Sequence, residues 1–214
     1  QEMTDFRDGS IGTLRIGVVS SVRGSLFMNL IKDFHSAYPN IKLSIHSANT
    51  YELLDTLQNR EIDLALVRTP FSSMDLDVLY MQREKILAVG LPSYFKTPVE
   101  KPLTLKTLAS TPLIIYRRWQ KVIEATFEAA GLIPNIFCVN DDASMTLLLA
   151  SQGFGVGLLH PSALQRESAE HVVYRPLEEN SLVSQIALVC QNRQQLPQTA
   201  LRFWDMVKIT HLQT

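Results

Sequence analysis

The sequence predicts an α/β protein of two Rossmann-like lobes joined by two crossing hinge strands. Residues 13–68 and 112–159 each follow the order strand, helix, strand, helix, strand, which favours parallel strands with crossover helices. A long extended segment separates the two runs, and further strands and a helix follow the second. The length of 214 residues, with 46% hydrophobic and 19% charged residues, fits such a globular protein.

In the first run, short apolar stretches predict strands, and apolar residues at spacings of three and four predict helices. Pro39 and Asn40 end the first helix, and Thr50 can cap the second. The expected elements are a strand Leu14–Val19, a turn Ser20–Gly24, a helix Ser25–Tyr38, a strand Ile41–Ile45, a helix Tyr51–Arg60 and a strand Asp63–Val67.

The rest of the chain is divided by the same signals. Gly131 and Gly153 end helices, and Asp141 with Asp142 precedes one. The expected elements are an extended segment Leu76–Leu91, a loop with Pro92, Pro98 and Pro102, a strand Pro112–Tyr116, a helix Gln120–Ala130, a strand Asn135–Val139, a helix Ala143–Gln152, strands Val156–Leu159, Val172–Tyr174 and Ser184–Val189, and a helix Gln198–Lys208 with Leu201, Trp204 and Val207 inward.

In such a fold, strand carboxyl ends and helix amino termini of both lobes can line one cleft, where ligands of open α/β sheets bind. The two crossing segments, near Arg83–Lys85 and near Ser184–Gln185, would form the hinge.

Composition excludes several classes of protein. The net charge of −1 does not attract DNA to the surface as a whole. No apolar run approaches the ~18 residues of a membrane span, and the polar stretch Gln1–Thr13 is not expected to be a signal peptide. Cys138 and Cys190 lie in apolar runs and are expected to be buried thiols in strands, although a disulfide is the alternative; thiols favour a reducing, cytoplasmic location. The start without Met suggests a mature secreted protein or a fragment.

Tests for metal, cofactor and catalytic chemistry give no candidates. The five histidines have no metal-ligand spacing. The glycines of Gly153–Gly157 follow a helix and precede a strand, whereas a dinucleotide loop needs the reverse order, so we expect a helix end and a tight turn. No His or Glu is expected in the turns at the cleft. The sequence therefore predicts no metal, no cofactor and no catalytic residue.

Polar residues at the expected strand ends are candidates for binding. Ser20 and Ser21 could capture an anion at a helix start or simply cap the helix. Thr50 could cap a helix alone or also face a ligand. Arg68 could be a solvated arginine or a ligand contact. In the second lobe, Arg117 and Arg118, between Tyr116 and Trp119, could form a surface patch or a carboxylate clamp. Asp142 and Ser144 are better explained as caps.

Five motifs occur in order along the chain: Gly12-x-Leu14-Arg15-Ile16-Gly17, Phe34-x-x-x-Tyr38-Pro39, Leu53-x-x-x-Leu57, Asp63-Leu64-Ala65-Leu66 and Leu149–Leu159. Together they resemble the effector-binding domain of LysR-type transcription regulators over essentially the whole chain. In the last motif, Ser151-Gln152 replaces a pair of alanines, and His160 is an extra residue before Pro161.

The resemblance implies a type 2 periplasmic-binding-protein fold. Lobe I would comprise residues 13–84 and 185–214, lobe II residues 85–184, and residues 1–12 would be the remnant of a linker. An N-terminal winged helix-turn-helix domain, absent from this chain, would bind DNA. The family's inducer positions, carried over by matching segments, fall on Ser21, Val22, Thr50, Arg68, Arg117 and Asp142, beside Ser20.

The function implied is that of an effector sensor, not an enzyme. A small organic acid, in particular a carboxylate, would bind between the lobes and shift the population of their arrangements. The resemblance also implies a homodimer or homotetramer, with the helix Tyr51–Arg60 of one chain against Gln120–Ala130 of the next. Tyr51 and Phe127 could be buried in that contact or could equally pack within one chain. The alternative is a secreted solute-binding protein of a transporter, which has the same fold.

Overall fold

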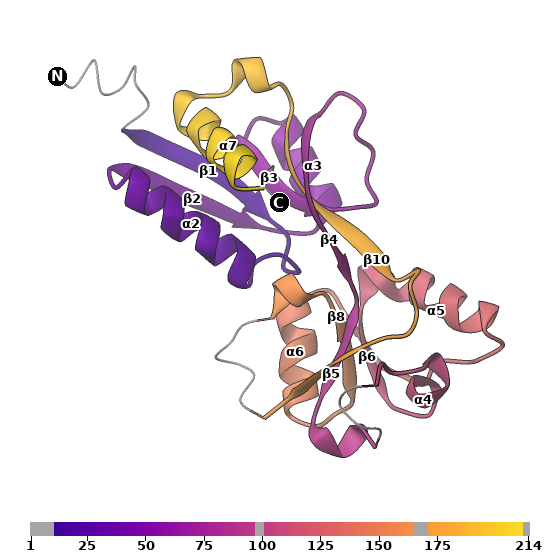
Figure 1. Ribbon diagram of the computed structural model, residues 1–214. Coiled ribbons are helices and arrows are strands. Elements are labelled where there is room, and N and C mark those ends of the chain that lie inside the picture. Colours follow the sequence, from indigo (N-terminus) through magenta and orange to yellow (C-terminus); the bar gives the residue numbers. More distant parts are fainter. Residues whose placement is uncertain (1–10, 97–100, 165–170, 212–214) are drawn as a thin grey trace. The chain divides into compact units, whose positions relative to one another are not determined.

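The computed structural model describes residues 11–96, 101–164 and 171–211 (Figure 1). The described residues up to Arg83, together with those from Gln185 onward, form one compact unit, and Glu84–Ser184 form the other. We call them unit 1 and unit 2. Each contains one five-stranded mixed sheet covered by helices, so the predicted α/β fold class is confirmed. The expected linker 1–12 lies almost wholly outside the described residues, as does Pro98.

Unit 1 is built on a sheet with the strand order β2-β1-β3-β10-β4. β1 is parallel to β2 and to β3, whereas β10 is antiparallel to β3. The elements are β1 (Gly12–Val18), α2 (Ser25–Ala37), β2 (Ile41–Ser47), α3 (Thr50–Gln58), β3 (Leu64–Arg68), β4 (Asp77–Lys85), β10 (Val183–Cys190), the 3₁₀ turn η5 (Arg193–Gln195) and α7 (Gln198–His211).

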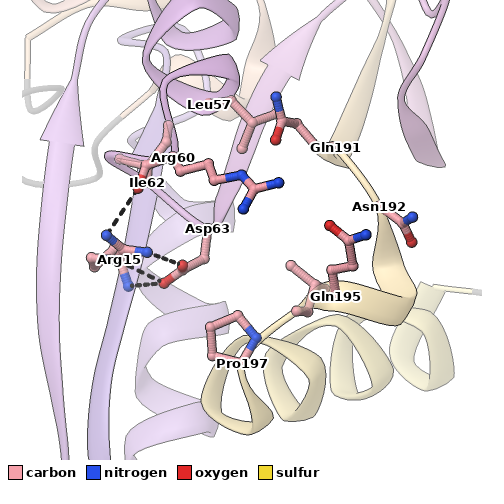
Figure 2. A pocket seen from close by; sticks show the side chains of 10 residues that line it. Arg15, Leu57, Arg60, Ile62, Asp63, Gln191, Asn192, Gln195 and Pro197 are labelled. Carbon is pink, nitrogen blue, oxygen red and sulfur yellow. Dashed lines mark hydrogen bonds and ion pairs between the residues drawn. The ribbon is translucent and has the colours of Figure 1, made fainter.

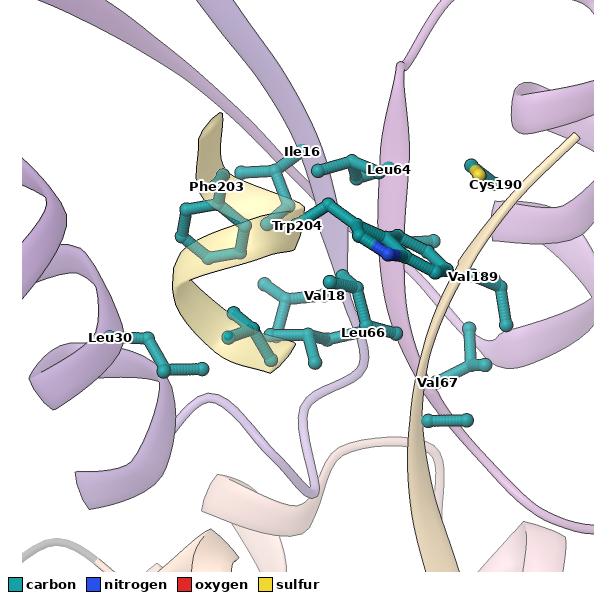
Figure 3. Close-up of a cluster of buried hydrophobic side chains, with 14 of the residues drawn as sticks. Ile16, Val18, Leu30, Leu64, Leu66, Val67, Val189, Cys190, Phe203 and Trp204 are labelled. Carbon is teal, nitrogen blue, oxygen red and sulfur yellow. The ribbon is translucent and has the colours of Figure 1, made fainter. Parts of the chain in front are cut away.

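Helices cover both faces of this sheet. Successive side chains of a strand point to opposite faces, and Figure 3 shows Ile16 and Val18 of β1 packed with Phe203 of α7 and Leu30 of α2. Gly17 points to the other face, where α3 packs so closely that an added Cβ would lie 2.7 Å from Leu53. Any larger residue at this position would require the buried side chains of Leu53 and Ile62 to shift.

Unit 2 repeats the arrangement with the strand order β7-β6-β8-β5-β9. β6 is parallel to β7 and β8, and β5 is antiparallel to β8 and β9. The elements are β5 (Leu87–Gly90), η1 (Pro92–Tyr94), α4 (Leu105–Ala109), β6 (Leu113–Tyr116), η2 (Arg117–Trp119), α5 (Gln120–Ala129), β7 (Ile136–Asn140), α6 (Ala143–Ser151), β8 (Val156–Leu159), η3 (Pro161–Ala163) and β9 (Val173–Pro176).

Three details of the expected element order are corrected. The extended segment Leu76–Leu91 is two strands, β4 and β5, which pair in different sheets. The short helix α4, which Thr104 caps by accepting from the Thr107 N–H, was not predicted. In α7 the buried apolar residues are Ala200, Phe203, Trp204 and Val207, whereas Leu201 is half-buried.

The glycine-rich stretch after α6 is a helix end and tight turn, as predicted. Gly153 has a φ of +80°, which favours glycine. An added Cβ at Gly155 would collide with the Pro112 carbonyl, so glycine allows the close approach of two chain segments. Gly131, with φ +69°, likewise ends α5.

The two cysteines are free and both lie in strands. Cys190 of β10 is buried, but Cys138 of β7 is only half-buried, so burial of both thiols was a wrong expectation. Within the described residues, every helix is too short or too polar to cross a membrane.

Candidate functional site

The carboxyl edge of the unit 1 sheet gathers the polar candidates of the first lobe. β1 and β3 run parallel, with Val18 paired to Leu66, so the chain after β1 and the end of β3 meet at one edge. Ser20 and Ser21 follow β1, and Arg68 ends β3. Both serines and Arg68 are buried, with 8%, 2% and 0% of their surface exposed.

Arg68 ties this edge together. Its Nε donates to Ser21 Oγ at 3.3 Å, and its Nη2 donates to the Ser21 carbonyl at 3.2 Å. The interpretation of Arg68 as a solvated arginine is therefore wrong. A buried guanidinium must have its donors satisfied, and here the turn after β1 supplies part of that requirement.

The expectation that Ser20 and Ser21 open a helix is also wrong. Helix α2 begins at Ser25, and its N-cap, Gly24, provides no side-chain hydrogen bond. The intervening turn is closed by the Val22 N–H, which donates to the Val19 carbonyl at 3.0 Å. Val22 itself is fully buried in the apolar core of unit 1. Neither serine therefore caps α2.

Thr50 is the first residue of α3 and not its cap. The cap is Asn49, whose side chain accepts from the Glu52 N–H at 3.1 Å and donates to the Glu52 carboxylate at 3.2 Å. Asn49 is thus an N-cap whose side chain also bonds to Glu52, and the pattern Asn49-x-x-Glu52 could have indicated this helix start. Thr50 is fully buried, and its Oγ1 has no hydrogen-bond partner among the described residues.

The corresponding edge of unit 2 is more polar on its surface. β6 ends at Tyr116, and in the following turn η2 the ring of Trp119 is buried, while Arg117 is exposed. Arg117 Nε pairs with Asp141 Oδ1 at 2.7 Å, and this hydrogen bond raises the pKa of Arg117 above its ordinary value. Arg117 and Asp141 thus form an ion pair on the surface. Of the two aspartates predicted to cap α6, only Asp142 does so.

Asp142 caps α6, as the sequence favoured. Its Oδ1 accepts from the backbone N–H groups of Ser144 at 2.6 Å and of Met145 at 3.3 Å. A carboxylate at a helix amino terminus is also stabilised by the helix dipole. This geometry satisfies two of the N–H groups that a helix start leaves unpaired.

Sequence reasoning missed a buried polar cluster at the end of β8. His160 directly follows this parallel strand, in a turn that the sequence did not single out as a candidate. His160 is 1% exposed, its Nε2 lies 2.8 Å from Ser184 Oγ, and its ring centroid lies 5.0 Å from that of Trp119. Next to it, Ser162 Oγ donates to Glu84 Oε2 at 2.7 Å. The signal was His160-Pro161 at a strand end.

This cluster has the residue types of a hydroxyl nucleophile and its base. Ser184 is 4% exposed and His160 1%, so both belong to the packed interior of unit 2. Within the described ranges, no group of three or more His, Cys, Asp or Glu residues could hold a metal ion. The polar groups at the carboxyl edges of the two sheets can bind a ligand and position it.

Comparison with known proteins defines the class. The family model described as the LysR substrate binding domain matches residues 7–210, so the chain belongs to this family of effector-binding domains of LysR-type transcription regulators. One relative, the transcriptional dual regulator GltC of Bacillus subtilis (strain 168), is 25% identical over 213 residues, which are 97% of this chain and 70% of GltC. The chain spans 47% to 72% of the length of the first four curated relatives.

Solved structures agree on the fold. Full-length CbnR in complex with its target DNA superposes with a TM-score of 0.79 at 16% identity, covering 97% of this chain and 71% of CbnR. The effector-binding domain of QuiR in complex with shikimate gives 0.73 at 17% identity, covering 91% of this chain and 94% of that one. At these identities the likeness establishes the fold, which is the predicted type 2 periplasmic-binding-protein fold.

The relatives also decide between the two functions that the sequence left open. Those compared are transcriptional regulators and not solute-binding proteins of transporters. They are not enzymes either, as the sequence predicted. The chain is thus the effector-binding domain of a transcription regulator.

Proposed function

We propose that this domain senses a small organic acid at the carboxyl edge of unit 1, and that this binding controls transcription by the full-length regulator. The site would comprise Ser20, Ser21, Val22, Thr50 and Arg68. In unit 2 the proposal includes Arg117 and Asp142, which lie at that unit's own carboxyl edge.

The observation that carries the proposal is the state of Thr50. A buried hydroxyl without a hydrogen-bond partner costs about 1–3 kcal/mol, so such groups persist where something other than stability requires them. Thr50 Oγ1 is such a group within the described residues, and it lies at the amino terminus of α3. There the helix dipole favours an anion, and the hydroxyl can donate to it.

The charge of Arg68 supports an acid as the ligand. The guanidinium is held at the same edge by its bonds to Ser21, so its position is fixed before any ligand arrives. A fixed positive charge in a buried environment stabilises a carboxylate more than it would in water. Val22, being wholly in the core, would contribute through its backbone or by shaping the turn.

The test is calorimetric titration of a panel of acids against the wild type and Thr50→Val. The panel contains shikimate, which QuiR binds, as well as benzoate and succinate, with benzamide as a neutral control. Valine keeps the shape of threonine and removes the hydroxyl, so affinity for the preferred acid should fall about 10-fold or more. Thr50→Ser, which keeps the hydroxyl, should bind more tightly than Thr50→Val.

Two results would contradict the proposal. One is an acid that binds the Thr50→Val variant as tightly as the wild type while the same variant is fully folded. The other is a preference for benzamide over benzoate, because it would remove the reason for assigning an anion. Thermal unfolding of Thr50→Val, which we expect to be at least as stable as the wild type, distinguishes a loss of affinity from a loss of folding.

DNA binding and self-association belong to the same proposal. We infer that DNA is bound by a winged helix-turn-helix domain of the full-length regulator, because this chain has a net charge of −1, and that the domain forms a homodimer or homotetramer. Tyr51 is 63% exposed on unit 1, whereas Phe127 is fully buried within unit 2, which is the packing within one chain that the sequence left open. Sedimentation with and without promoter DNA tests both points: a monomer, or co-sedimentation of this chain with DNA, would contradict them.

A further inference from the structure

We propose that unit 1 has a second binding site, for a small monocarboxylate, at the amino edge of its sheet. This site neither uses the residues of the proposed effector site nor depends on that proposal. It is a cavity of about 150 Å³ between the end of α3, the start of β3 and the segment from β10 to α7. A cavity of this volume can hold a molecule the size of benzene.

The topology separates this cavity from the effector edge. Asp63 precedes the first residue of β3, and its backbone N–H donates to the Arg15 carbonyl of β1 at 2.8 Å, whereas Arg68 ends β3. The cavity therefore lies at the opposite end of β3. Its lining comes from α3 through Leu57, whereas Thr50 lies at the other end of this helix.

Two of the charged groups in the cavity neutralise each other. Arg15 Nη2 lies 2.5 Å from Asp63 Oδ1, and Arg15 Nε donates to Asp63 Oδ2 at 3.2 Å. Arg15 Nη1 donates to the Arg60 carbonyl at 3.0 Å, so the guanidinium is held on three sides. The Asp63 side chain is only 4% exposed and that of Arg15 is 42% exposed, so the pair is anchored at its buried carboxylate.

The third charge is available to a ligand. In the part of the chain that the structure describes, no hydrogen bond or ion pair engages the Arg60 side chain, and Figure 2 shows its guanidinium directed into the cavity towards Gln191 and Gln195. Gln191 is positioned by its own bond, from Nε2 to the Gln58 carbonyl at 3.1 Å. The cavity thus presents one unpaired positive charge flanked by amide groups.

The backbone at Arg60 gives an independent reason to expect a role for its side chain. Arg60 has a φ of +60°, a left-handed conformation at the end of α3. Its N–H donates to the Leu57 carbonyl at 3.0 Å, and the Glu61 N–H donates to the Thr56 carbonyl at 3.1 Å, which is the helix ending that strongly favours glycine. Arginine adopts this conformation at a cost, although glycine would end the helix equally well.

The class of ligand follows from charge and lining. The net charge of the lining side chains is +1, because Arg15 and Asp63 cancel, and this matches a monoanion. A guanidinium recognises a carboxylate through two parallel N–H donors. The rest of the lining is apolar and accepts a short alkyl chain or a single ring, from Leu57, Ile62, Leu196 and Pro197.

The proposal is tested by nuclear magnetic resonance titration of the whole chain with propionate, butyrate and benzoate, with sodium chloride keeping the ionic strength constant. The signals followed are the backbone amides of Glu61, Gln191 and Gln195, which adjoin or line the cavity. We expect saturable shifts with at least one acid, and affinity at least about tenfold weaker in Arg60→Gly and Arg60→Ala. Arg60→Gly should unfold at a temperature no lower than the wild type, because glycine relieves the left-handed conformation.

Two further variants make the result specific. Lys32→Ala removes an exposed charge from α2, on the other face of the sheet, and should bind as the wild type does. Thr50→Val separates the two sites: affinity lost in Thr50→Val but kept in Arg60→Gly would place the acid at the effector edge and overturn this proposal alone. Absence of saturable shifts, or equal affinity for butyramide and butyrate, would also overturn it.

Discussion

In each of the two units an arginine lies at the carboxyl end of a parallel strand, Arg68 at the end of β3 and Arg117 directly after β6, but their environments differ. Arg68 of unit 1 is fully buried and bonded to Ser21, whereas Arg117 of unit 2 is exposed and paired with Asp141 on the surface. Equivalent topology therefore does not give equivalent energetics. Burial decides how much the hydrogen bonds of a polar group at such an edge contribute to the stability of the fold.

The largest expected difference between the two edges is in stability. Arg68→Ala should lower the free energy of unfolding by about 3 kcal/mol, because it leaves a cavity in the core and removes the donors that the Ser21 hydroxyl and carbonyl accept from. Arg117→Ala should leave the free energy of unfolding unchanged, because an exposed ion pair contributes little. Urea denaturation of both variants measures the difference.

Equal decreases in the free energy of unfolding of Arg68→Ala and Arg117→Ala would contradict the difference inferred between the two edges. Because Arg68→Ala also creates a void, Ser21→Ala is the gentler control. It deletes only the hydroxyl that accepts from Arg68 Nε, and it should cost about 1 kcal/mol. A Ser21→Ala variant as stable as the wild type would show that this bond is not formed in solution.

A smaller effect of opposite sign separates two buried threonines. Thr50 Oγ1 in unit 1 has no partner among the described residues, whereas Thr146 Oγ1 in unit 2 accepts from Asn140 Nδ2 at 2.9 Å. Thr146→Val should therefore destabilise the protein by about 1 kcal/mol, and Thr50→Val should be neutral or stabilising by up to about 1 kcal/mol. Thermal unfolding without ligand tests the sign.

The comparison would fail if both valine variants were destabilised to the same extent, because Thr50 would then have a partner in solution. If Thr50→Val gained stability and lost affinity for an acid, the hydroxyl would be retained for binding at the expense of stability. Such opposed effects of one substitution are characteristic of functional sites.

The smallest effect concerns the two thiols. Burial, together with the charge of Asp77, raises the pKa of Cys190 to about 12, and Cys138 is half-buried. At pH 8 iodoacetamide should modify Cys138 in the folded protein and leave Cys190 intact, because the thiolate is the nucleophile. In urea both should react.

The raised pKa of Cys190 also has a consequence for stability. An unfolded thiol ionises near its ordinary pKa, about 8.5, whereas the folded one stays protonated up to about 12. The unfolded state therefore loses its proton first, and the contribution of Cys190 to stability is complete below the unfolded pKa and declines as the pH rises towards 12. Replacement by alanine should flatten this decline. Modification of Cys190 in the folded state at the same rate as Cys138 would contradict the assignment.

The sequence determined the fold because its signals are local. Apolar spacing in 13–68 and 112–159 specified both runs of strands and helices. The helix ends at Gly131 and Gly153 were also predictable, because glycine readily adopts the left-handed conformation found there. The motifs from Gly12 to Leu159 specified the family. The cap at Asp142 was likewise readable, since a cap contacts only the next two or three residues.

What only the tertiary structure decided are contacts between residues far apart in the chain. Burial of Arg68 depends on Ser21, 47 positions away, and His160 meets Ser184 over 24. In the sequence Arg60 is a charged residue at a helix end, and only the structure shows that it lines a cavity with the segment after β10. The spacing of residues along the sequence does not predict contacts such as Arg68–Ser21 and His160–Ser184. These contacts depend on the order of the strands in each sheet and on which side chains the packed helices bury.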